Sequence, residues 1–379
     1  MIYLDNAATT FPKPKCVYDE VLHCMKKYCG NPGRSSHKMS IESSEKIFEA
    51  RTEIAELFNA QAENVVFTYN TTYALNIAIK SNLKQNSHVL ISDIEHNAVL
   101  RPIFAEYERG FCTFDVFSTN GDDEEILSDI SAKITPKTSM LICTHVSNVC
   151  SKRLPIQKIG ELCKNLGIFF IVDGAQSAGI YDIDIEKMNI DALCIPGHKA
   201  LYGPQGVGAV IFKNDCIGKT LFEGGTGINS LEAQMPDFLP ERFEAGTLST
   251  PAIAGLCEGV KWVKATGTEI IRHHEEELYK LLCDLLDTNE KIVCYKLSEN
   301  CGNTLMFNIV GKSSSSVNYE LDKRNICTRS GFHCSPMAHK KLNTGDSGAV
   351  RVGIGAFTTQ KDIYYLFDAL QEIIKDKKI

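Results

Sequence analysis

The stretch that decides the fold is IFFIVDGAQSAGIYDIDIEKMNIDALCIPGHKALYGPQGVGAVIFK, residues 168–213. It holds three short apolar runs, at 168–175, 191–197 and 207–213, and each has the length and composition of a buried strand. Asp173 closes the first run, and Lys199 follows the second on a loop rich in glycine and proline. The residues just beyond these strands are therefore the first candidates for a functional site.

The same pattern continues toward the N-terminus. Further strand-like runs are ENVVFTY (63–69), HVLISD (88–93) and TSMLICTH (138–145), and helix-like stretches such as TTYALNIAIKSNL (71–83) and LPIQKIGELCKNLG (154–167) lie between the runs. Strands that alternate with helices predict an α/β fold with a mostly parallel sheet. Ligands in such sheets bind at the carboxyl ends of the strands.

The C-terminal part has a different pattern. A long helix is expected over 251–267 and an amphipathic one over 273–288, followed by short strands in IVCYKL (292–297) and NTLMFNIV (303–310). GKSSSS (311–316) reads as a flexible polar loop, and a last amphipathic helix is expected over roughly 360–376. This pattern predicts a second, smaller α+β domain, which suits a chain of 379 residues.

Composition narrows the class of protein. A net charge of −7 argues against a nucleic-acid-binding surface, and no apolar run is long enough for a membrane span or a signal peptide. The 15 cysteines include no C-x-x-C pair and no zinc-finger spacing. We therefore expect free thiols, a cytoplasmic location and no metal site.

Asp173 and Lys199 indicate a cofactor when they are taken together. Alone, Asp173 also suits a helix cap, and a lysine on such a loop is usually solvated. Pyridoxal phosphate, however, needs a lysine amine and an acidic partner for its ring nitrogen. Thr71 and Thr72, at the start of a predicted helix, suit a phosphate group. His96 follows another strand and suits the face of the ring.

Six motifs resemble one known family nearly end to end. They are YLDNAATT (3–10), NPGRSSHKMS (31–40), VDGAQSAG (172–179), GHKALYGPQGVG (197–208), RFEAGTLST (242–250) and RSGFHC (329–334). As a set they resemble class V aminotransferase-fold enzymes of the cysteine desulfurase/selenocysteine lyase family. The last motif is similar to that of the group II, SUF-type enzymes. The resemblance implies the fold of type I pyridoxal phosphate enzymes, with a seven-stranded-type sheet.

The resemblance also implies roles for individual residues. Lys199 would hold the cofactor and move protons, Asp173 would pair with the ring nitrogen, and Gln176 would bind the ring hydroxyl. The other implied roles are stacking on the ring by His96, phosphate binding by Thr71, Thr72, His198 and a neighbouring subunit's Thr247, substrate binding by Asn148 and Arg351, and sulfur acceptance by Cys334. Residues 15–255 would form the large cofactor-binding domain, and residues 1–14 with 256–379 the small domain that carries the Cys334 loop.

One residue departs from the family pattern. Pro196 stands where the family commonly has a serine whose hydroxyl helps to bind phosphate. Because proline offers neither a hydroxyl nor an N–H, we expect weaker retention of the cofactor. On the Cys334 loop, His333 and Arg329 are expected to favour the thiolate by their charge, unless the loop is simply solvated.

The function implied is conversion of L-cysteine to L-alanine by a homodimer, with sulfur passed to Cys334 as a persulfide and onward to a possible acceptor protein. Selenocysteine β-lyase activity, another C–S lyase or desulfinase activity, and a non-catalytic cofactor-binding scaffold for sulfur delivery remain alternatives. The intact pair of Lys199 and Asp173 argues against the scaffold, which has no need of an electron sink.

Three other segments are not predicted to bind a metal ion or a nucleotide. His273 and His274 are adjacent on a helix and face different ways, so a metal pair is not expected. Residues 311–316 lack the spacing of a nucleotide-binding loop. EGGTGINS (223–230) is expected to shape the rim of the active site or of a dimer interface.

Overall fold

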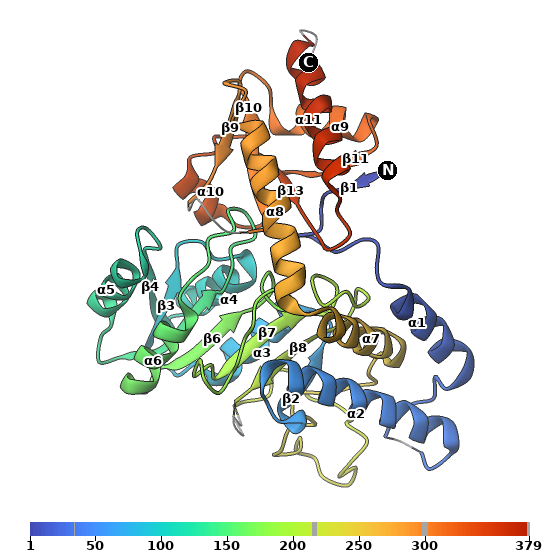
Figure 1. Ribbon diagram of the computed structural model, residues 1–379. Helices are drawn as coiled ribbons and strands as arrows, with labels where there is room; N and C mark the ends of the chain where they lie inside the picture. The colour runs from blue at the N-terminus through green and yellow to red at the C-terminus, as the bar shows by residue number, and fades with distance from the viewer. Residues whose placement is uncertain (34, 214–217, 298–301, 377–379) are drawn as a thin grey trace.

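The predicted α/β sheet has seven strands in the computed structural model, which describes residues 1–33, 35–213, 218–297 and 302–376. The strand order is β2-β8-β7-β6-β5-β3-β4, and only β8 runs antiparallel to its neighbours. Figure 1 shows this sheet in the lower lobe. The strands are β2 (Val65–Thr68), β3 (Ser87–Ser92), β4 (Cys112–Phe117), β5 (Thr138–Thr144), β6 (Phe169–Asp173), β7 (Ala192–Pro196) and β8 (Gly208–Phe212).

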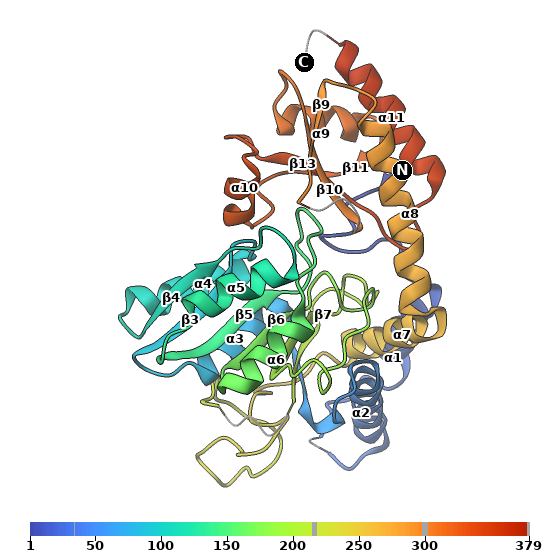
Figure 2. The ribbon, with the colours of Figure 1, turned by 60° about the vertical axis from the view of Figure 1, so that its left-hand side comes forward.

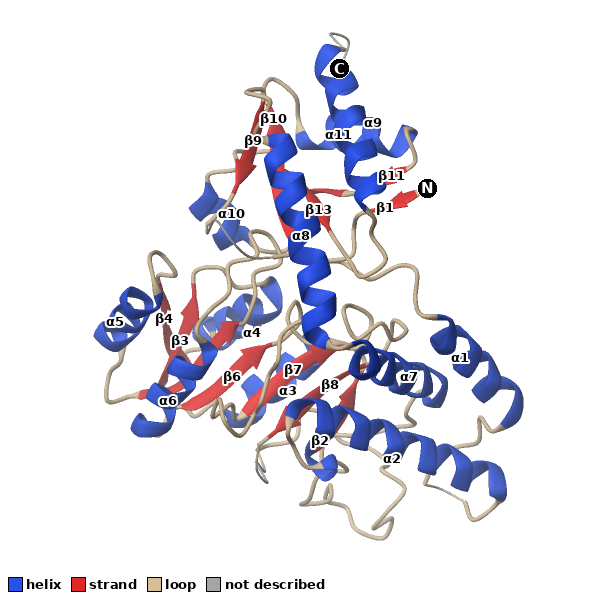
Figure 3. Cartoon of the chain, in the orientation of Figure 1, coloured by secondary structure: helices blue, strands red, loops and turns tan. Residues whose placement is uncertain are grey.

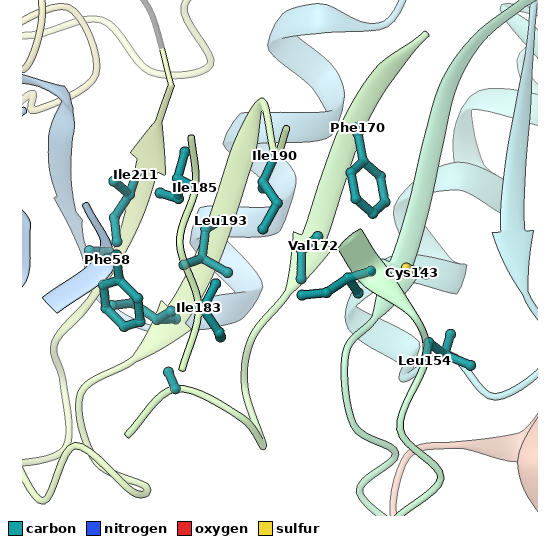
Figure 4. Packing of buried hydrophobic residues seen from close by; sticks show 14 of the residues in the cluster. Phe58, Cys143, Leu154, Phe170, Val172, Ile183, Ile185, Ile190, Leu193 and Ile211 are labelled. Atoms are coloured by element: carbon teal, nitrogen blue, oxygen red, sulfur yellow. The ribbon is translucent and has the colours of Figure 1, made fainter. Parts of the chain in front are cut away.

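Helices cover both faces of this sheet because its central strands are apolar on both sides. Met140 and Ile142 of β5 pack in one cluster with α3 (Thr71–Asn82) and α4 (Asn97–Glu108). Leu141 and Cys143 face the other way, in a second cluster (Figure 4). The helices of that second face are α2 (Lys38–Phe58), α5 (Asp123–Lys133), α6 (Ile156–Leu166) and α7 (Thr250–Thr266), with α1 (Lys15–Lys27) against α7 and the short 3-10 helix η1 (Ala62–Asn64) before β2.

Strand β4 is absent from the predicted strands. It lies at the edge of the sheet, beside β3 alone, and its residues alternate between buried and exposed. The polar residues Thr113 and Asp115 interrupt the apolar run that marks the central strands. An edge strand that faces water therefore gives a weaker sequence signal than a central one.

The smaller lobe carries a four-stranded antiparallel sheet in the order β12-β13-β10-β9, as Figure 3 shows above the large sheet. Its core lies between this sheet and the helices α8, α9 and α11. The elements are α8 (Thr268–Leu286), β9 (Ile292–Tyr295), β10 (Thr304–Ile309), α9 (Ser314–Lys323), β11 (Ile326–Cys327), β12 (Arg329–Gly331), α10 (Pro336–Leu342), β13 (Ala349–Gly353) and α11 (Gln360–Lys375).

The flexible loop expected over 311–316 is partly wrong. Helix α9 begins at Ser314, and the Ser313 side chain caps it by accepting a hydrogen bond from the Ser316 N–H. A run of serines predicts a loop by composition, yet serine is also one of the best N-cap residues. The start of a helix is therefore the better interpretation of this run.

The N-terminus lies with the smaller lobe. Strand β1 (Ile2–Tyr3) pairs in parallel with β11, and both views place the N-terminus beside α11 (Figures 1 and 2). Helix α7, which spans residue 256, packs on α1 and α2 in the large lobe. The division into 15–255 and 1–14 with 256–379 stays a prediction.

Two general features concern the described residues alone. None of the helices in the described part of the chain is long and apolar enough to cross a membrane. The 13 cysteines that the structure describes are all free thiols, as the sequence predicts.

Candidate active site

A cavity of about 210 Å³ opens at the carboxyl ends of the large sheet's strands. Every predicted site residue except Thr247 and Cys334 lines this cavity. Each loop that follows β2, β3, β5, β6 or β7 contributes, and β12 and β13 of the smaller lobe contribute one arginine each. The predicted residues that line it are Thr71, Thr72, His96, Asn148, Asp173, Gln176, His198, Lys199 and Arg351.

Lys199 and Asp173 form the charged centre of the cavity. Burial lowers the pKa of Lys199 to about 8, and the negative charge of Asp173 opposes that shift. Asp173 is 3% exposed, and burial raises the pKa of its carboxyl. One oxygen of Asp173 accepts a hydrogen bond from the Ala175 N–H at 2.9 Å. A weakly basic amine beside a buried carboxylate is the arrangement that nucleophilic or proton-transfer chemistry requires.

His96 and Gln176 line the same cavity, and each side chain makes a hydrogen bond to the backbone. His96 caps α4, where its Nδ1 accepts a hydrogen bond from the Ala98 N–H at 3.0 Å. Burial, with Lys199 second, lowers the pKa of His96 to about 4, so the imidazole is neutral and Nε2 carries its proton. The Gln176 amide donates to the Ala7 carbonyl at 3.0 Å.

Nitrogen atoms without a hydrogen-bond partner within the described residues occur at the start of α3 and on His198. The Asn70 side chain caps α3 at the Tyr73 N–H, and no hydrogen bond of the Thr71 or Thr72 N–H is found within the described residues. Nδ1 of His198 is buried without a partner, and burial lowers the pKa of this imidazole to about 4. Free N–H groups at a helix N-terminus form an anion site.

Arg351 also lines the cavity and is buried, with 2% of its surface exposed. Its Nη2 donates to Asp5 Oδ1 at 2.8 Å, and its Nη1 lies 3.3 Å from the Asn148 carbonyl oxygen. Arg329 on β12 stands opposite Arg351 in the register of β12 and β13 and also lines the cavity. Neither Arg329 nor Asp5 has a predicted binding role, although they lie in the motifs RSGFHC and YLDNAATT.

Cys334 is exposed and lies outside the set of residues that line the cavity. Its carbonyl accepts a hydrogen bond from the Asn97 N–H at 2.7 Å, which ties the loop to the residue after His96. His333 and Cys334 both adopt left-handed backbone conformations, with φ of 49° and 58°. Such conformations are costly for non-glycine residues, so the surrounding contacts must hold them.

Asn148 supplies two of those contacts. Its Nδ2 donates to the His333 carbonyl at 2.9 Å, and its Oδ1 accepts from the Ser335 hydroxyl at 2.7 Å. The Asn148 side chain thus binds the loop on both sides of Cys334. Asn148 lines the cavity as predicted, and its observed partners are residues of the loop.

His333 does not carry the positive charge that the sequence suggested. It is 4% exposed, its Nε2 lies 3.2 Å from the Arg329 carbonyl oxygen, and its Nδ1 lies 3.1 Å from His339 Nε2. Burial lowers the pKa of His333 to about 3, so the ring is neutral at pH 7. The expected charge of His333 beside the thiol is therefore wrong, and because this side chain is buried the solvated-loop alternative is also wrong for His333.

Thr247 lies elsewhere. It is exposed and lines a separate cavity of about 360 Å³ with Tyr69, Tyr73 and Phe222. Its predicted contact with a neighbouring subunit's phosphate stays a prediction.

The remaining candidates stay apart from the site. Nε2 of His274 lies 2.9 Å from the Thr358 carbonyl oxygen, whereas His273 is exposed. Glu49, Cys257 and Glu258 lie close enough to share an ion, but Lys46 and Lys261 already pair with both carboxylates.

The chain belongs to the aminotransferase class-V family, whose profile matches residues 2–366. Two curated relatives show which family within class V the chain resembles. A probable cysteine desulfurase from Methanothermobacter thermautotrophicus is 30% identical over 381 residues, covering 98% of this chain and 94% of the relative. Cysteine desulfurase IscS from Clostridium botulinum (strain Hall) is 31% identical, covering 100% and 95%. Within class V, the chain therefore belongs to the cysteine desulfurase family, and the predicted family and class of enzyme, dependent on pyridoxal phosphate, are confirmed.

Solved structures agree. The apo structure of a cysteine desulfurase from Thermococcus onnurineus has a TM-score of 0.89 at 29% identity, covering 99% of this chain and 94% of that one. The cysteine desulfurase CsdA from Escherichia coli has a TM-score of 0.87 at 23% identity, covering 98% and 94%, and this likeness bears on the fold alone.

Proposed function

We propose that this protein is a pyridoxal phosphate-dependent cysteine desulfurase that converts L-cysteine to L-alanine and takes the sulfur on Cys334. The observation that carries the proposal is one cavity that holds Lys199, Asp173 and Arg351, with the Cys334 loop fastened beside it. Relatives named cysteine desulfurase over nearly the whole chain support it.

The residues present fit pyridoxal phosphate. The side-chain amine of Lys199 makes no hydrogen bond or ion pair within the described residues, and burial keeps part of this amine neutral near pH 8. Asp173 offers a buried carboxylate to a protonated ring nitrogen. The unpaired Nδ1 of His198 and the start of α3 offer donors to a phosphate. Each part of the cofactor thus has a matching group.

Each of these residues has one task in the proposal. Lys199 would hold the cofactor through its amine and would move the proton at the substrate Cα. Asp173 would pair with the ring nitrogen, Gln176 would bind the ring hydroxyl, and His96 would stack on the ring. Thr71, Thr72 and His198 bind the phosphate, joined by a neighbouring subunit's Thr247. Bound pyridoxal phosphate supplies the electron sink that no side chain offers.

Cys334 accepts the sulfur. Its thiolate attacks the substrate sulfur, an S–S bond forms, and the Cβ–S bond breaks with its electron pair left on the carbon framework, which is then protonated. The product left behind is alanine, and Cys334 carries a persulfide. Asn148, which the sequence assigns to the substrate, also holds the loop that presents this thiol.

Arg351 binds the substrate carboxylate. It is a buried guanidinium at the cavity wall, and its planar fork matches a carboxylate. Lys199 and Arg351 stand close enough for the arginine to lower the lysine pKa. Because Lys199 and Arg351 line the same cavity, we expect an amino acid held by its carboxylate at Arg351 to present its Cα to Lys199.

The finer assignments belong to the same proposal. They are a two-fold homodimer with composite sites, a cytoplasmic location and a protein that accepts the persulfide sulfur. Sedimentation at low protein concentration tests the first. A monomer that keeps its cofactor and its turnover would contradict the role given to Thr247.

Steady-state production of alanine from L-cysteine tests the function. The purified protein with pyridoxal phosphate and a thiol reductant should release alanine and sulfide in equal amounts. Lys199→Ala should abolish both products and the borohydride-trapped label on the peptide that contains residue 199. Absence of alanine from the wild-type holoenzyme would overturn the proposal.

A further inference from the structure

Two acceptors within the protein itself bind the guanidinium of Arg351. Nη2 donates to Asp5 Oδ1 at 2.8 Å, Nη1 faces the Asn148 carbonyl at 3.3 Å, and Nε is buried without a partner. Asp5 is its one acidic partner within the described residues. The guanidinium plane is therefore set by one carboxylate and one carbonyl oxygen.

The backbone around Asp5 is fastened to the strand that carries Arg351. The Gly353 N–H donates to the Leu4 carbonyl at 2.7 Å, and Asn6 Nδ2 donates to the Gly353 carbonyl at 3.0 Å. A Cβ on Gly353 would stand 2.6 Å from the Ala7 nitrogen, so only glycine permits this approach. The backbone contacts on either side of Asp5 therefore fix the position of this residue beside β13.

Charge explains why an acid is needed here. Arg329 and Arg351 are cross-strand partners, and each disfavours the charged form of Lys199. Arg329 also opposes the charge of Arg351, whereas Asp5 supports it. Two guanidiniums and one carboxylate leave a net charge of about +1, which matches a single substrate carboxylate.

We propose that Asp5 is a positioning residue that orients Arg351 for the substrate carboxylate and restricts the site to amino acids with one carboxylate. This inference rests on the proposed function, because Arg351 must be the group that binds substrate. Asp5 does not line the cavity, so it acts chiefly through Arg351, and its charge also favours the ammonium form of Lys199.

A rival role for Asp5 has the opposite sign. If Asp5 occupied the place of the substrate carboxylate, its removal would free Arg351 and tighten substrate binding. If Asp5 supports Arg351, its removal leaves a buried guanidinium without its acidic partner, and binding weakens. The direction of the change in affinity separates the two.

The test compares Asp5→Asn with wild-type holoenzyme, and Asp19→Asn serves as the matched control on the exposed face of α1. Equilibrium binding of L-alanine, which has no sulfur to lose, is measured by calorimetry. Asp5→Asn should weaken it by about tenfold or more, the usual effect of losing a charge-assisted hydrogen bond. KM for L-cysteine should rise in parallel while kcat changes little. Unchanged or tighter binding of L-alanine would overturn the proposal.

L-aspartate supplies a readout that a general loss of structure does not produce. Because Asp5→Asn adds one net positive charge, the affinity for L-aspartate relative to L-alanine should rise, by about fivefold or more. A ratio equal to that of the wild-type enzyme would overturn the selectivity role.

Asp5→Glu keeps the test decisive if the asparagine variant does not fold. This variant retains the charge with a longer side chain, so it should weaken L-alanine binding yet keep the wild-type preference against L-aspartate. A shifted preference in Asp5→Glu would contradict the charge argument. Wild-type enzyme that binds L-alanine but yields none from L-cysteine would refute the desulfurase function and leave the Asp5 measurement valid. Wild-type enzyme that fails to bind L-alanine would overturn the role of Asp5.

Discussion

The amine of Lys199 should titrate near pH 8 in the cofactor-free protein, because burial lowers its pKa to about 8. At pH 7 the neutral amine then makes up about 10% of the molecules, against about 0.03% for a lysine of ordinary pKa. Reaction of this amine with an electrophile at pH 7 should therefore gain about 300-fold from its ionisation alone.

Two substitutions should move this titration in opposite directions. Asp173 favours the ammonium form of Lys199, so Asp173→Asn should lower the titration midpoint. Arg329 disfavours the ammonium form, so Arg329→Gln should raise it. Both changes follow from the sign of the removed charge, whatever the effective dielectric constant.

Competitive acylation measures the midpoint. The cofactor-free protein is pulsed with trace acetic anhydride from pH 6 to 11, and the peptide that contains Lys199 is quantified against that of the exposed Lys164. A wild-type midpoint at or above about pH 10 would refute the reasoning, since burial would then not govern this lysine. Shifts of the same sign in both variants would refute the assignment of its neighbours.

Three further predictions follow from particular residues. Cys334→Ala should lose orders of magnitude in kcat with L-cysteine but retain much of the activity with L-selenocysteine, whose leaving group needs no attacking thiolate; equal losses would give Cys334 another role. Pro196→Ser should tighten pyridoxal phosphate binding in equilibrium titration, and unchanged affinity would dismiss the missing hydroxyl as the cause. Burial raises the pKa of the Glu275 carboxyl from its ordinary value of 4.5 to about 8. The protonated carboxyl therefore contributes fully to the stability of the fold below pH 4.5, and this contribution is lost as the pH rises through 8. Glu275→Gln should flatten this fall in thermal melts between pH 5 and 9; an unaltered slope would contradict it.

Much of the site was predictable because it depends on strand ends. An apolar run followed by a polar residue marks a place where a side chain reaches the carboxyl edge of the sheet, which is how Asp173 and His96 were found. The same logic failed for β4, whose edge position leaves it half exposed. It also failed for His333, since nothing in RSGFHC shows that this histidine is buried against His339.

Long-range pairing explains what the sequence could not show. Asp5 and Arg351 are 346 residues apart, and no periodicity links them. In the sequence, Asn148 is an ordinary polar loop residue. The structure shows that both polar atoms of its side-chain amide, Nδ2 and Oδ1, bind the Cys334 loop. The role predicted for Thr247 requires a second subunit, which no pattern within one chain can place.

The N-terminal segment joins the two sources of the active site. Lys199 comes from the large lobe and Arg351 from the smaller one, and their separation decides whether one amino acid can meet both. Asp5 holds Arg351, while the Thr10 hydroxyl donates to the Lys199 carbonyl at 2.8 Å. Lys13 Nζ donates to the His198 carbonyl at 2.7 Å. Residues 5–13 thus contact both β13 and the Lys199 loop, so the opening motif connects the groups that we propose to bind substrate and cofactor.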